Sequence, residues 1–254
     1  MRYFITIPSY NERENITRLV GEILETGPEY FVCVVDDNSP DGTPVELERF
    51  AASLPEGKKA RFEYIIRSKK DGRGGAVRDG LLHGIQSGIL YDAYIEMDAD
   101  FSHAPHDLPR GIACLAHADV AIASRYPDGK IVGWPLKRRL LSRLANLLAR
   151  TLIDWRITDY TSGYRFYSLR AAKLIVRMPQ EHKGFIYLSE ILAYCSKAGL
   201  RIVGFPFTFV DREKGVSSAD YKEVFAALVG IFMIGWRYHF APLPEIQTGG
   251  TQKN

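Results

Sequence analysis

Hydrophobic residues along the chain alternate between two kinds of spacing. Short runs in which nearly every residue is apolar are followed by longer stretches whose apolar residues recur every three or four positions. The first spacing predicts buried strands and the second predicts amphipathic helices. This alternation predicts an α/β fold with a mostly parallel central sheet. The predicted strands are Tyr3–Pro8, Tyr30–Asp36, Phe62–Arg67, Ala93–Met97 and Val120–Ser124, and helices are predicted near Glu14–Thr26, Pro44–Leu54, Gly75–Leu90 and His106–His117.

Polar motifs follow the predicted strands at the points where the apolar runs end. Asp98-Ala99-Asp100 follows the fourth strand, and Asp36-Asp37 opens a polar segment after the second strand. Ligands of open α/β sheets bind outside the carboxyl ends of the strands, and Mg²⁺ is typically held by one or two carboxylates together with substrate phosphates. We therefore interpret Asp98 and Asp100 as a metal–diphosphate site. A turn or a helix cap is the alternative for a lone Asp-x-Asp, but the second acidic strand end favours a shared site.

The alternation of strands and helices stops after Tyr126. In the C-terminal half that follows, two segments carry apolar residues suited to a membrane surface. Residues 135–150 predict an amphipathic helix with leucines on one face and basic residues in its first turns. Such a helix either lies on an anionic membrane or packs on the protein with its basic side in water. Residues 224–236 carry no charge and precede Arg237, which indicates an interface anchor, a core helix or a subunit contact. A spanning helix needs about 20 apolar residues, so we expect no crossing.

Composition narrows the class of protein. The formal net charge of +3 is too small to indicate nucleic acid, and 46% hydrophobic residues are ordinary for a globular protein. Cys33, Cys114 and Cys195 lack metal-type spacing and are predicted to be buried thiols of a reducing compartment. No signal-peptide pattern opens the chain, so we expect a cytoplasmic protein. Residues 241–254 have no periodicity and are predicted to be disordered.

Three further segments carry candidate chemistry with more than one interpretation. Arg73 lies in the glycine-rich stretch 72–76 at a helix start, where we expect a tight loop and allow the arginine a phosphate contact. Arg212 and Lys214 follow a late predicted strand, Arg201–Phe205, in a loop that closes over a diphosphate or is simply exposed and charged. His103 is predicted to support a turn and not to bind metal, because no other histidine has ligand spacing.

In their order and spacing these motifs resemble glycosyltransferase family 2, and within it the dolichyl- or polyprenyl-phosphate mannosyltransferases. The resemblance covers about residues 2–218. Two positions depart from the usual family pattern, since Arg73 stands where leucine is common and Ser218 where lysine is common. The matching strings are Pro8-Ser9-Tyr10-Asn11-Glu12, Asp36-Asp37-Asn38-Ser39-Pro40-Asp41-Gly42-Thr43, Met97-Asp98-Ala99-Asp100-Phe101-Ser102-His103-Ala104-Pro105, Ser124-Arg125-Tyr126, Thr161-Ser162-Gly163-Tyr164-Arg165-Phe166-Tyr167 and Arg212-Glu213-Lys214-Gly215-Val216-Ser217.

The resemblance implies a GT-A fold, a Rossmann-like nucleotide-sugar domain over residues 1–217, followed by an apolar helix over 218–240. It assigns Asp98 and Asp100 to a Mg²⁺ or Mn²⁺ ion, with Ser102 where some relatives supply a further ligand. Arg73, Arg138, Arg139 and Lys214 are the candidates for the acceptor phosphate. The other nucleotide-sugar contacts would come from Pro8, Tyr10, Glu12, Val35, Asp37, Ala99, Arg125 and Arg212.

Together these assignments predict metal-dependent, inverting transfer of a hexose, mannose from GDP-mannose, onto a polyprenyl or dolichyl monophosphate. Asp98, Asp100 and Arg212 would neutralise the leaving diphosphate. A lipid monophosphate is already ionised at neutral pH and needs no general base. Two alternatives stay open: transfer from UDP-glucose or to a hydroxyl, with Asp159 or Glu190 as base, and a non-catalytic nucleotide-sugar-binding subunit of a membrane complex. We expect peripheral contact with the cytoplasmic membrane face, leave room for a membrane partner subunit, and expect no nucleic-acid partner.

Overall fold

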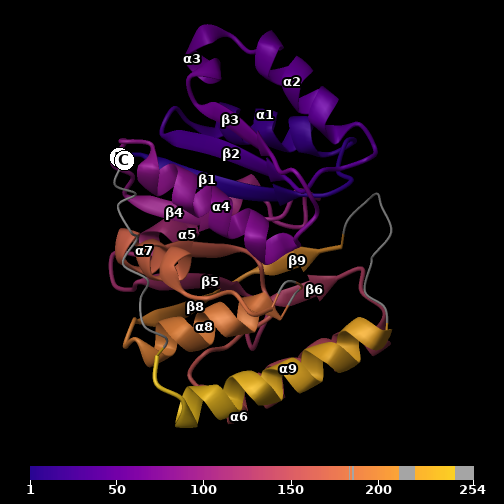
Figure 1. Cartoon of the computed structure of the whole chain (residues 1–254), viewed down its shortest axis with the longest axis vertical. Helices are drawn as coiled ribbons and strands as arrows, with labels where there is room; N and C mark the ends of the chain where they lie inside the picture. The colour runs from indigo at the N-terminus through magenta and orange to yellow at the C-terminus, as the bar shows by residue number, and fades with distance from the viewer. Residues whose placement is uncertain (183, 185, 212–220, 244–254) are drawn as a thin grey trace, which may run out of the picture.

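A seven-stranded sheet forms the centre of the molecule (Figure 1). The computed structural model describes residues 1–182, 184, 186–211 and 221–243, with the backbone alone for 221–228. The strands are β1 Tyr3–Ser9, β2 Tyr30–Asp36, β3 Phe62–Ile66, β4 Ala93–Glu96, β5 Val120–Ser124, β6 Lys130–Val132, β7 Arg165–Tyr167, β8 Ile202–Pro206 and β9 Thr208–Val210. The helices are α1 Ile16–Thr26, α2 Thr43–Ser53, α3 Glu56–Lys59, α4 Arg73–Gln86, a 3₁₀ turn at Pro105–Asp107, α5 Leu108–Cys114, α6 Leu136–Leu152, α7 Leu169–Arg177, α8 Tyr187–Lys197 and α9 Tyr221–Phe240.

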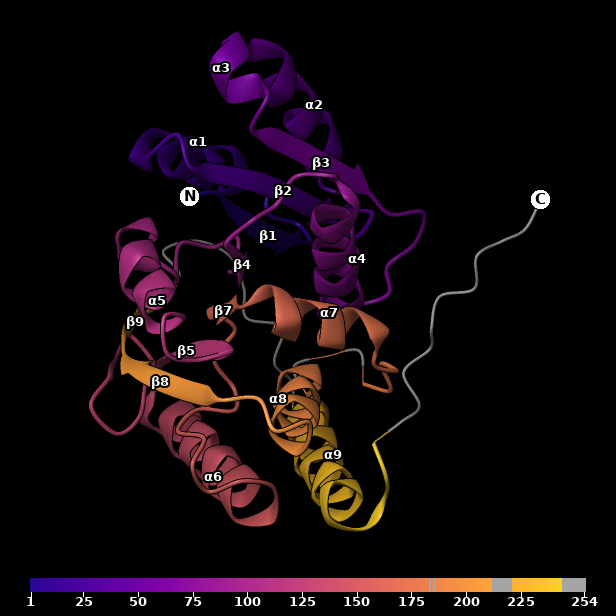
Figure 2. The same cartoon turned by 90° about the vertical axis from the view of Figure 1, so that its left-hand side faces the viewer.

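The sheet is mostly parallel, as the sequence predicts. Its strand order is β3-β2-β1-β4-β7-β5-β8, in which only β7 runs antiparallel to its neighbours β4 and β5. Helices α1 and α5 cover one face, and α4 and α7 cover the other (Figure 2). A separate parallel pair joins β6 to β9. Neither β7 nor this pair was predicted, because each of these strands is three residues long and shows no clear periodicity.

The strands are apolar on both sides because helices cover both faces of the sheet. In β1 successive side chains point to opposite faces, so that Phe4 packs in the cluster under α4 while Ile5 packs in the cluster under α1. Cys33 and Cys195 are buried free thiols, as predicted. The prediction for Cys114 is wrong: it is only half-buried, because it is the last residue of the short α5.

Helices α6 and α9 lie side by side at one end of the molecule (Figures 1 and 2). The alternative in which the apolar stripe of α6 packs on the protein fails for most of that stripe, because four of its leucines are exposed: Leu136, Leu140, Leu144 and Leu147. Leu148 and Leu152 of the same helix pack against the core. On α9, Ile231 and Ile234 are buried while aromatic neighbours point outward. We call the exposed set the two-helix apolar face, made of Leu136, Leu140, Leu144, Leu147, Val229, Phe232, Met233, Trp236 and Phe240.

Two further sequence predictions concern the end of the chain. Within the described residues, no helix is long and apolar enough to span a bilayer, in line with the expectation for 224–236. The tail predicted to be disordered lies mostly outside the described residues, at 244–254. Its first residue, Ala241, is held against the protein, because its carbonyl accepts a hydrogen bond from Lys197 Nζ.

Candidate functional site

The carboxyl ends of β1, β2, β3 and β4 meet at one edge of the sheet because these strands are parallel neighbours. The loops that follow three of them each contain a non-glycine residue with left-handed backbone: Asn11 (φ 60°), Asn38 (φ 59°) and Phe101 (φ 62°). Asparagine adopts this conformation readily, but a bulky aromatic residue does so rarely. The Phe101 backbone is therefore strained, and such strain concentrates at ligand sites. Asp100 and Ser102 flank it.

Asp98 and Asp100 lie together at this edge, directly after β4. The Asp98 side chain is 25% exposed, whereas Asp100 is buried. Asp100 Oδ1 accepts hydrogen bonds from Ser102 Oγ at 2.6 Å and Ser102 N at 3.1 Å, so the predicted third ligand stands beside the second. These are hard oxygen donors that suit Mg²⁺ or Mn²⁺. Within the described part of the chain no three His, Cys, Asp or Glu residues form a metal cluster, so a cation held here would need further ligands such as water or substrate phosphates.

His103 supports the acidic loop, as predicted from the sequence. The Asp98 backbone N–H donates to His103 Nδ1 at 2.8 Å, and the imidazole stacks on Tyr164 with ring centroids 4.8 Å apart. Burial lowers the pKa of His103, which favours the neutral ring whose Nδ1 can accept this bond. The buried histidine thereby fixes the backbone from which Asp98 projects.

Arg73 lies beside the acidic pair and is not turned toward open solvent. Its guanidinium forms ion pairs with Asp98 and, at 2.7 Å, with Glu96, and Nη2 also donates to Gly163 O at 3.3 Å. Sequence reasoning missed Glu96, the fully buried last residue of β4. The sequence did contain a sign of this residue's role, because a glutamate inside an apolar strand needs a buried partner.

The residues predicted to hold the nucleoside line the adjacent loops in different ways. Tyr10 is 37% exposed and its ring centroid lies 3.5 Å from Lys70 Nζ. Pro8 and Glu12 are half-buried. Asp37 is buried and accepts hydrogen bonds from Arg67 Nη1 at 2.7 Å and from the backbone of the segment that enters α4.

Two residues expected at the nucleotide sugar have side chains inside the core. Val35 packs in the cluster beneath α4 and Ala99 in the cluster on the opposite face. Both side chains are buried, so only their backbone groups are available to a ligand. A sequence motif can indicate that a position lies near a ligand, but it does not show whether the backbone or the side chain makes the contact.

Arg125 is buried and bound to a second acidic residue. Its guanidinium makes a bidentate pair with Asp159, with Nε–Oδ2 at 2.8 Å and Nη2–Oδ1 at 2.9 Å, and also donates to Thr161. Burial raises the pKa of Asp159, but the Arg125 charge and hydrogen bonds outweigh this and lower it. Asp159 is thus an ionised partner of Arg125, which leaves it poorly placed to act as a base.

Arg138 and Arg139, at the start of α6, connect this helix to the small β6–β9 sheet. Arg138 stacks on Trp134 with 4.0 Å between its Cζ and the ring centroid, and pairs with Asp211 at 3.3 Å. Arg139 donates to Ile131 O at 3.0 Å. The predicted phosphate ligands Arg212 and Lys214, together with Ser218, lie outside the described residues.

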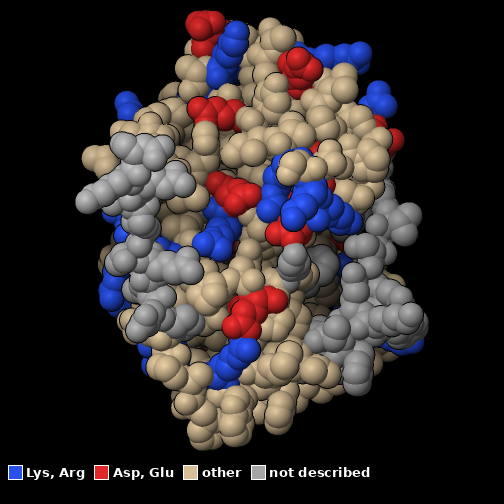
Figure 3. Space-filling model, viewed as in Figure 1, with Lys and Arg blue, Asp and Glu red and all other residues tan. Residues whose placement is uncertain are grey.

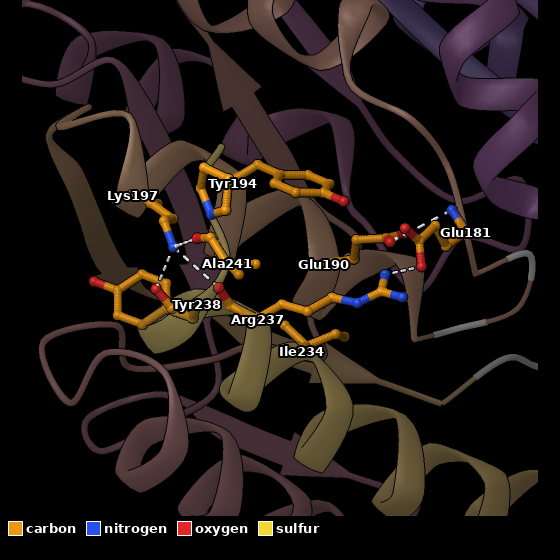
Figure 4. Close-up of a pocket in the computed structure, with 10 residues that line it drawn as sticks. Glu181, Glu190, Tyr194, Lys197, Ile234, Arg237, Tyr238 and Ala241 are labelled. Atoms are coloured by element: carbon orange, nitrogen blue, oxygen red, sulfur yellow. Dashed lines mark hydrogen bonds and ion pairs between the residues drawn. The ribbon is translucent and has the colours of Figure 1, made fainter. Parts of the chain in front are cut away.

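Glu190 belongs to a different pocket, between α8 and α9, with a cavity of about 160 Å³ (Figure 4). Its carboxylate pairs with His182 at 3.1 Å. Arg237 pairs with Glu181 across the pocket, and Lys197 donates to the carbonyl of Tyr238 near the end of α9. Among the described residues, no other predicted site residue lines this pocket. Sequence reasoning had considered Glu190 as a base, but its neighbours are those of a helix-packing site.

Comparison with known proteins decides which family has this arrangement. Residues 4–175 match the model of Glycosyl transferase family 2. The chain belongs to glycosyl transferase family 2. Among named members, it is 38% identical to an undecaprenyl-phosphate mannosyltransferase of Micrococcus luteus, over 91% of this chain and 93% of that protein. It is 36% identical to a polyprenol monophosphomannose synthase of Mycolicibacterium smegmatis, over 93% of this chain and 88% of that protein.

Solved structures confirm the GT-A fold that the family resemblance implied. The glucosyl-3-phosphoglycerate synthase of Mycobacterium tuberculosis, in a complex with Mn²⁺, UDP and glucosyl-3-phosphoglycerate, superposes with a TM-score of 0.65 at 15% identity, covering 95% of this chain and 81% of that one. At this identity the likeness concerns the fold alone. Family membership makes the protein a glycosyltransferase, as predicted.

Proposed function

We propose that the protein transfers mannose from GDP-mannose to a polyprenyl or dolichyl monophosphate, with inversion at the anomeric carbon. The observation that carries this proposal is the similarity of 36–38% over nearly the whole chain to two proteins named for polyprenyl-phosphate mannose synthesis. Those names support mannose as the sugar, the guanine base rests on the sequence resemblance alone, and UDP-glucose is the competing donor.

The two-helix apolar face supports a lipid acceptor. Its leucines and aromatic residues are contributed by two neighbouring helices, and the end of the molecule that these helices build is largely uncharged on the face shown in Figure 3. Lys137 and Arg143 on α6 are exposed. Apolar residues with basic neighbours suit an anionic membrane surface, so we infer peripheral contact with the cytoplasmic face of a membrane.

The acidic pair supports a divalent metal. Asp98 and Asp100 would hold Mg²⁺ or Mn²⁺, with Ser102 beside them and the donor's phosphates completing the coordination. A cation bound there would neutralise charge on the leaving diphosphate. Arg212, directly beyond the described Asp211, is our candidate for a second positive group at the diphosphate.

The acceptor phosphate needs no base from the protein. Its second pKa lies near 6, so an oxygen is already anionic at neutral pH. That oxygen forms a bond to the anomeric carbon while the bond from this carbon to the diphosphate oxygen breaks, and the nucleoside diphosphate leaves. Asp159 is bound to Arg125 and Glu190 lies in a separate pocket, so neither supports transfer to a hydroxyl. The chain retains both Asp98 and Asp100, which disfavours a purely non-catalytic subunit.

A transfer assay tests the proposal. The full chain is incubated with labelled GDP-mannose or UDP-glucose and with polyprenyl phosphate in detergent, with and without EDTA. We expect lipid-linked mannose from GDP-mannose, abolished by EDTA and restored by excess Mg²⁺ or Mn²⁺. Product from UDP-glucose alone would contradict GDP-mannose as the donor. Transfer that persists in EDTA would contradict the requirement for a divalent metal. Transfer to a soluble hydroxyl alone would contradict polyprenyl phosphate as the acceptor.

A further inference from the structure

Arg73 places a fixed positive charge beside a proposed metal ligand. It is the first residue of α4, and only 15% of its side chain is exposed. The guanidinium bridges Glu96 and Asp98. A cation at the start of a helix is opposed by the helix dipole, so the two carboxylates must hold the charge there.

Glu96 prevents Arg73 from swinging away from this position. The glutamate is fully buried, and its carboxylate accepts hydrogen bonds from Tyr187 and, at 2.9 Å, from Tyr167. If the guanidinium left, Glu96 would remain as a buried carboxylate without a counter-charge, which is strongly unfavourable. Arg73 is therefore anchored through Glu96 and reaches Asp98 from that anchor.

The backbone of Gly163 closes the other side of the guanidinium. A Cβ atom at this glycine would lie 2.6 Å from Arg73 Nη2 and 3.5 Å from Asp98 Oδ1. A side chain at this position would displace the guanidinium, so Arg73 and Asp98 pack closely against the segment that enters β7. This close packing adds to the Glu96 contact that holds the positive charge at Asp98.

We propose that Arg73 couples metal binding to nucleotide binding, by keeping the affinity of the Asp98–Asp100 pair for a divalent cation low until a nucleoside diphosphate arrives. The inference rests on the metal site of the proposed function. Arg73 offsets part of the negative charge that attracts a cation, and it repels the cation directly. The anionic diphosphate restores the attraction. By linkage the effect is reciprocal, so loss of the nucleoside diphosphate after transfer also weakens metal binding.

Metal titrations on variants of the full chain test this coupling. Mn²⁺ binding is followed by the electron paramagnetic resonance signal of the free ion, without nucleotide and with saturating GDP, after correction for Mn²⁺ bound by GDP in solution. Arg73→Met combined with Glu96→Gln removes both members of the buried pair, and it differs from Glu96→Gln alone by the Arg73 charge. We expect this double variant to bind Mn²⁺ alone at least about ten-fold more tightly than Glu96→Gln, because a unit charge at ion-pair distance is worth at least about that factor. The enhancement by GDP should shrink correspondingly.

Three further variants separate coupling from structural damage. Glu96→Gln alone retains the Arg73 charge, because the guanidinium keeps its contacts with Asp98 and the Gly163 carbonyl and can donate to the glutamine amide oxygen, and it should leave the enhancement by GDP intact. Arg73→Gln removes the charge but keeps an amide donor, so it provides the test if the double variant does not fold, as judged by circular dichroism. Arg78→Met removes a charge from the same helix, at a residue whose Nε donates to the Val176 carbonyl, and should behave as wild type.

The outcomes distinguish this inference from the proposed function. Unchanged or weaker Mn²⁺ binding without nucleotide would overturn the coupling, in a folded Arg73→Gln relative to the wild type or in the double variant relative to Glu96→Gln, and would leave Arg73 as a residue that merely orients Asp98. An equal gain in Arg78→Met would also overturn it, since the effect would then be one of net charge. If the wild type bound no Mn²⁺ even with GDP, the metal site itself, and with it the proposed function, would fail.

Discussion

Asp100 is a buried acidic residue at the start of a short strained loop. Phe101 holds left-handed backbone directly after it, and Ser102 donates to it twice. The loop thus presents a carboxylate whose orientation is set before any ligand binds. Positioned charge of this kind costs little reorganisation when a ligand binds.

Replacing Asp100 with asparagine tests whether the charge, and not the shape, is required. The amide oxygen can still accept the Ser102 bonds, so we expect an unchanged unfolding midpoint in urea. The transfer rate should fall by about 100-fold or more, because a cation ligand is lost. Asp128→Asn, an exposed site, is the control and should keep wild-type kcat/KM. A variant at position 100 with full activity would exclude this residue as a ligand.

At the scale of helices and strands, predictability follows length and periodicity. Strand β2 was predicted with both of its ends, Tyr30–Asp36, because seven consecutive residues are apolar or end on the acidic motif. Strand β7 has three residues, too few for a periodic signal, although it lies in the middle of the sheet. Short strands owe their conformation to their neighbours, which a local pattern does not contain.

The same distinction applies to the candidate site. Asp98 and Asp100 were found because they follow a strand end, which is a local feature. The partnership of Arg73 with Glu96 joins residues 23 positions apart, and that of Arg125 with Asp159 joins residues 34 apart. A buried charge needs a partner, but only the fold shows which side chains meet. Arg73 was accordingly assigned to the acceptor phosphate, whereas it lies at the acidic pair.

Gly235 controls how closely α9 approaches α6. A Cβ atom there would lie 2.8 Å from both the carbonyl oxygen and the Cβ of Leu152, and backbone atoms cannot move aside cheaply. Gly235→Ala should therefore destabilise the docking of α9 by about 1–3 kcal/mol. Hydrogen exchange of residues 229–240 would measure this as faster exchange.

Gly21 on α1 is the matched control for this substitution. It is also a helical glycine, but a Cβ atom there meets nothing within 4 Å. Gly21→Ala should be neutral or should stabilise the protein by up to about 1 kcal/mol, because alanine favours helices over glycine. Equal protection of α9 in Gly235→Ala and in the wild type would show that the two helices tolerate a wider separation.

At the scale of the whole molecule, the two-helix apolar face is our candidate for the membrane contact. Leu140→Gln with Trp236→Gln should weaken flotation with anionic phospholipid vesicles by about ten-fold or more, since both side chains are more than half exposed and their removal costs apolar area. Transfer to long polyprenyl phosphate in vesicles should fall, while transfer to a short, water-soluble isoprenyl phosphate should not.

Val45→Gln with Leu90→Gln provides the comparison. These residues are also at least half exposed but belong to α2 and to the segment before β4, away from the two-helix apolar face. They should leave vesicle binding unchanged. If both pairs of substitutions reduced binding equally, lipid contact would be a general property of the surface, and the assignment to α6 and α9 would be lost.

The position of β7 has a consequence for the order in which the chain can fold. Strands β4 and β5 follow each other along the chain, yet β7 separates them in the sheet and bonds to both. During synthesis the sheet cannot close before residues 165–167 emerge, and until then β4 and β5 present unpaired edges. A fragment that stops before residue 165 should aggregate even though it contains Asp98 and Asp100, so we expect that the chain cannot be shortened to the half that ends before β7.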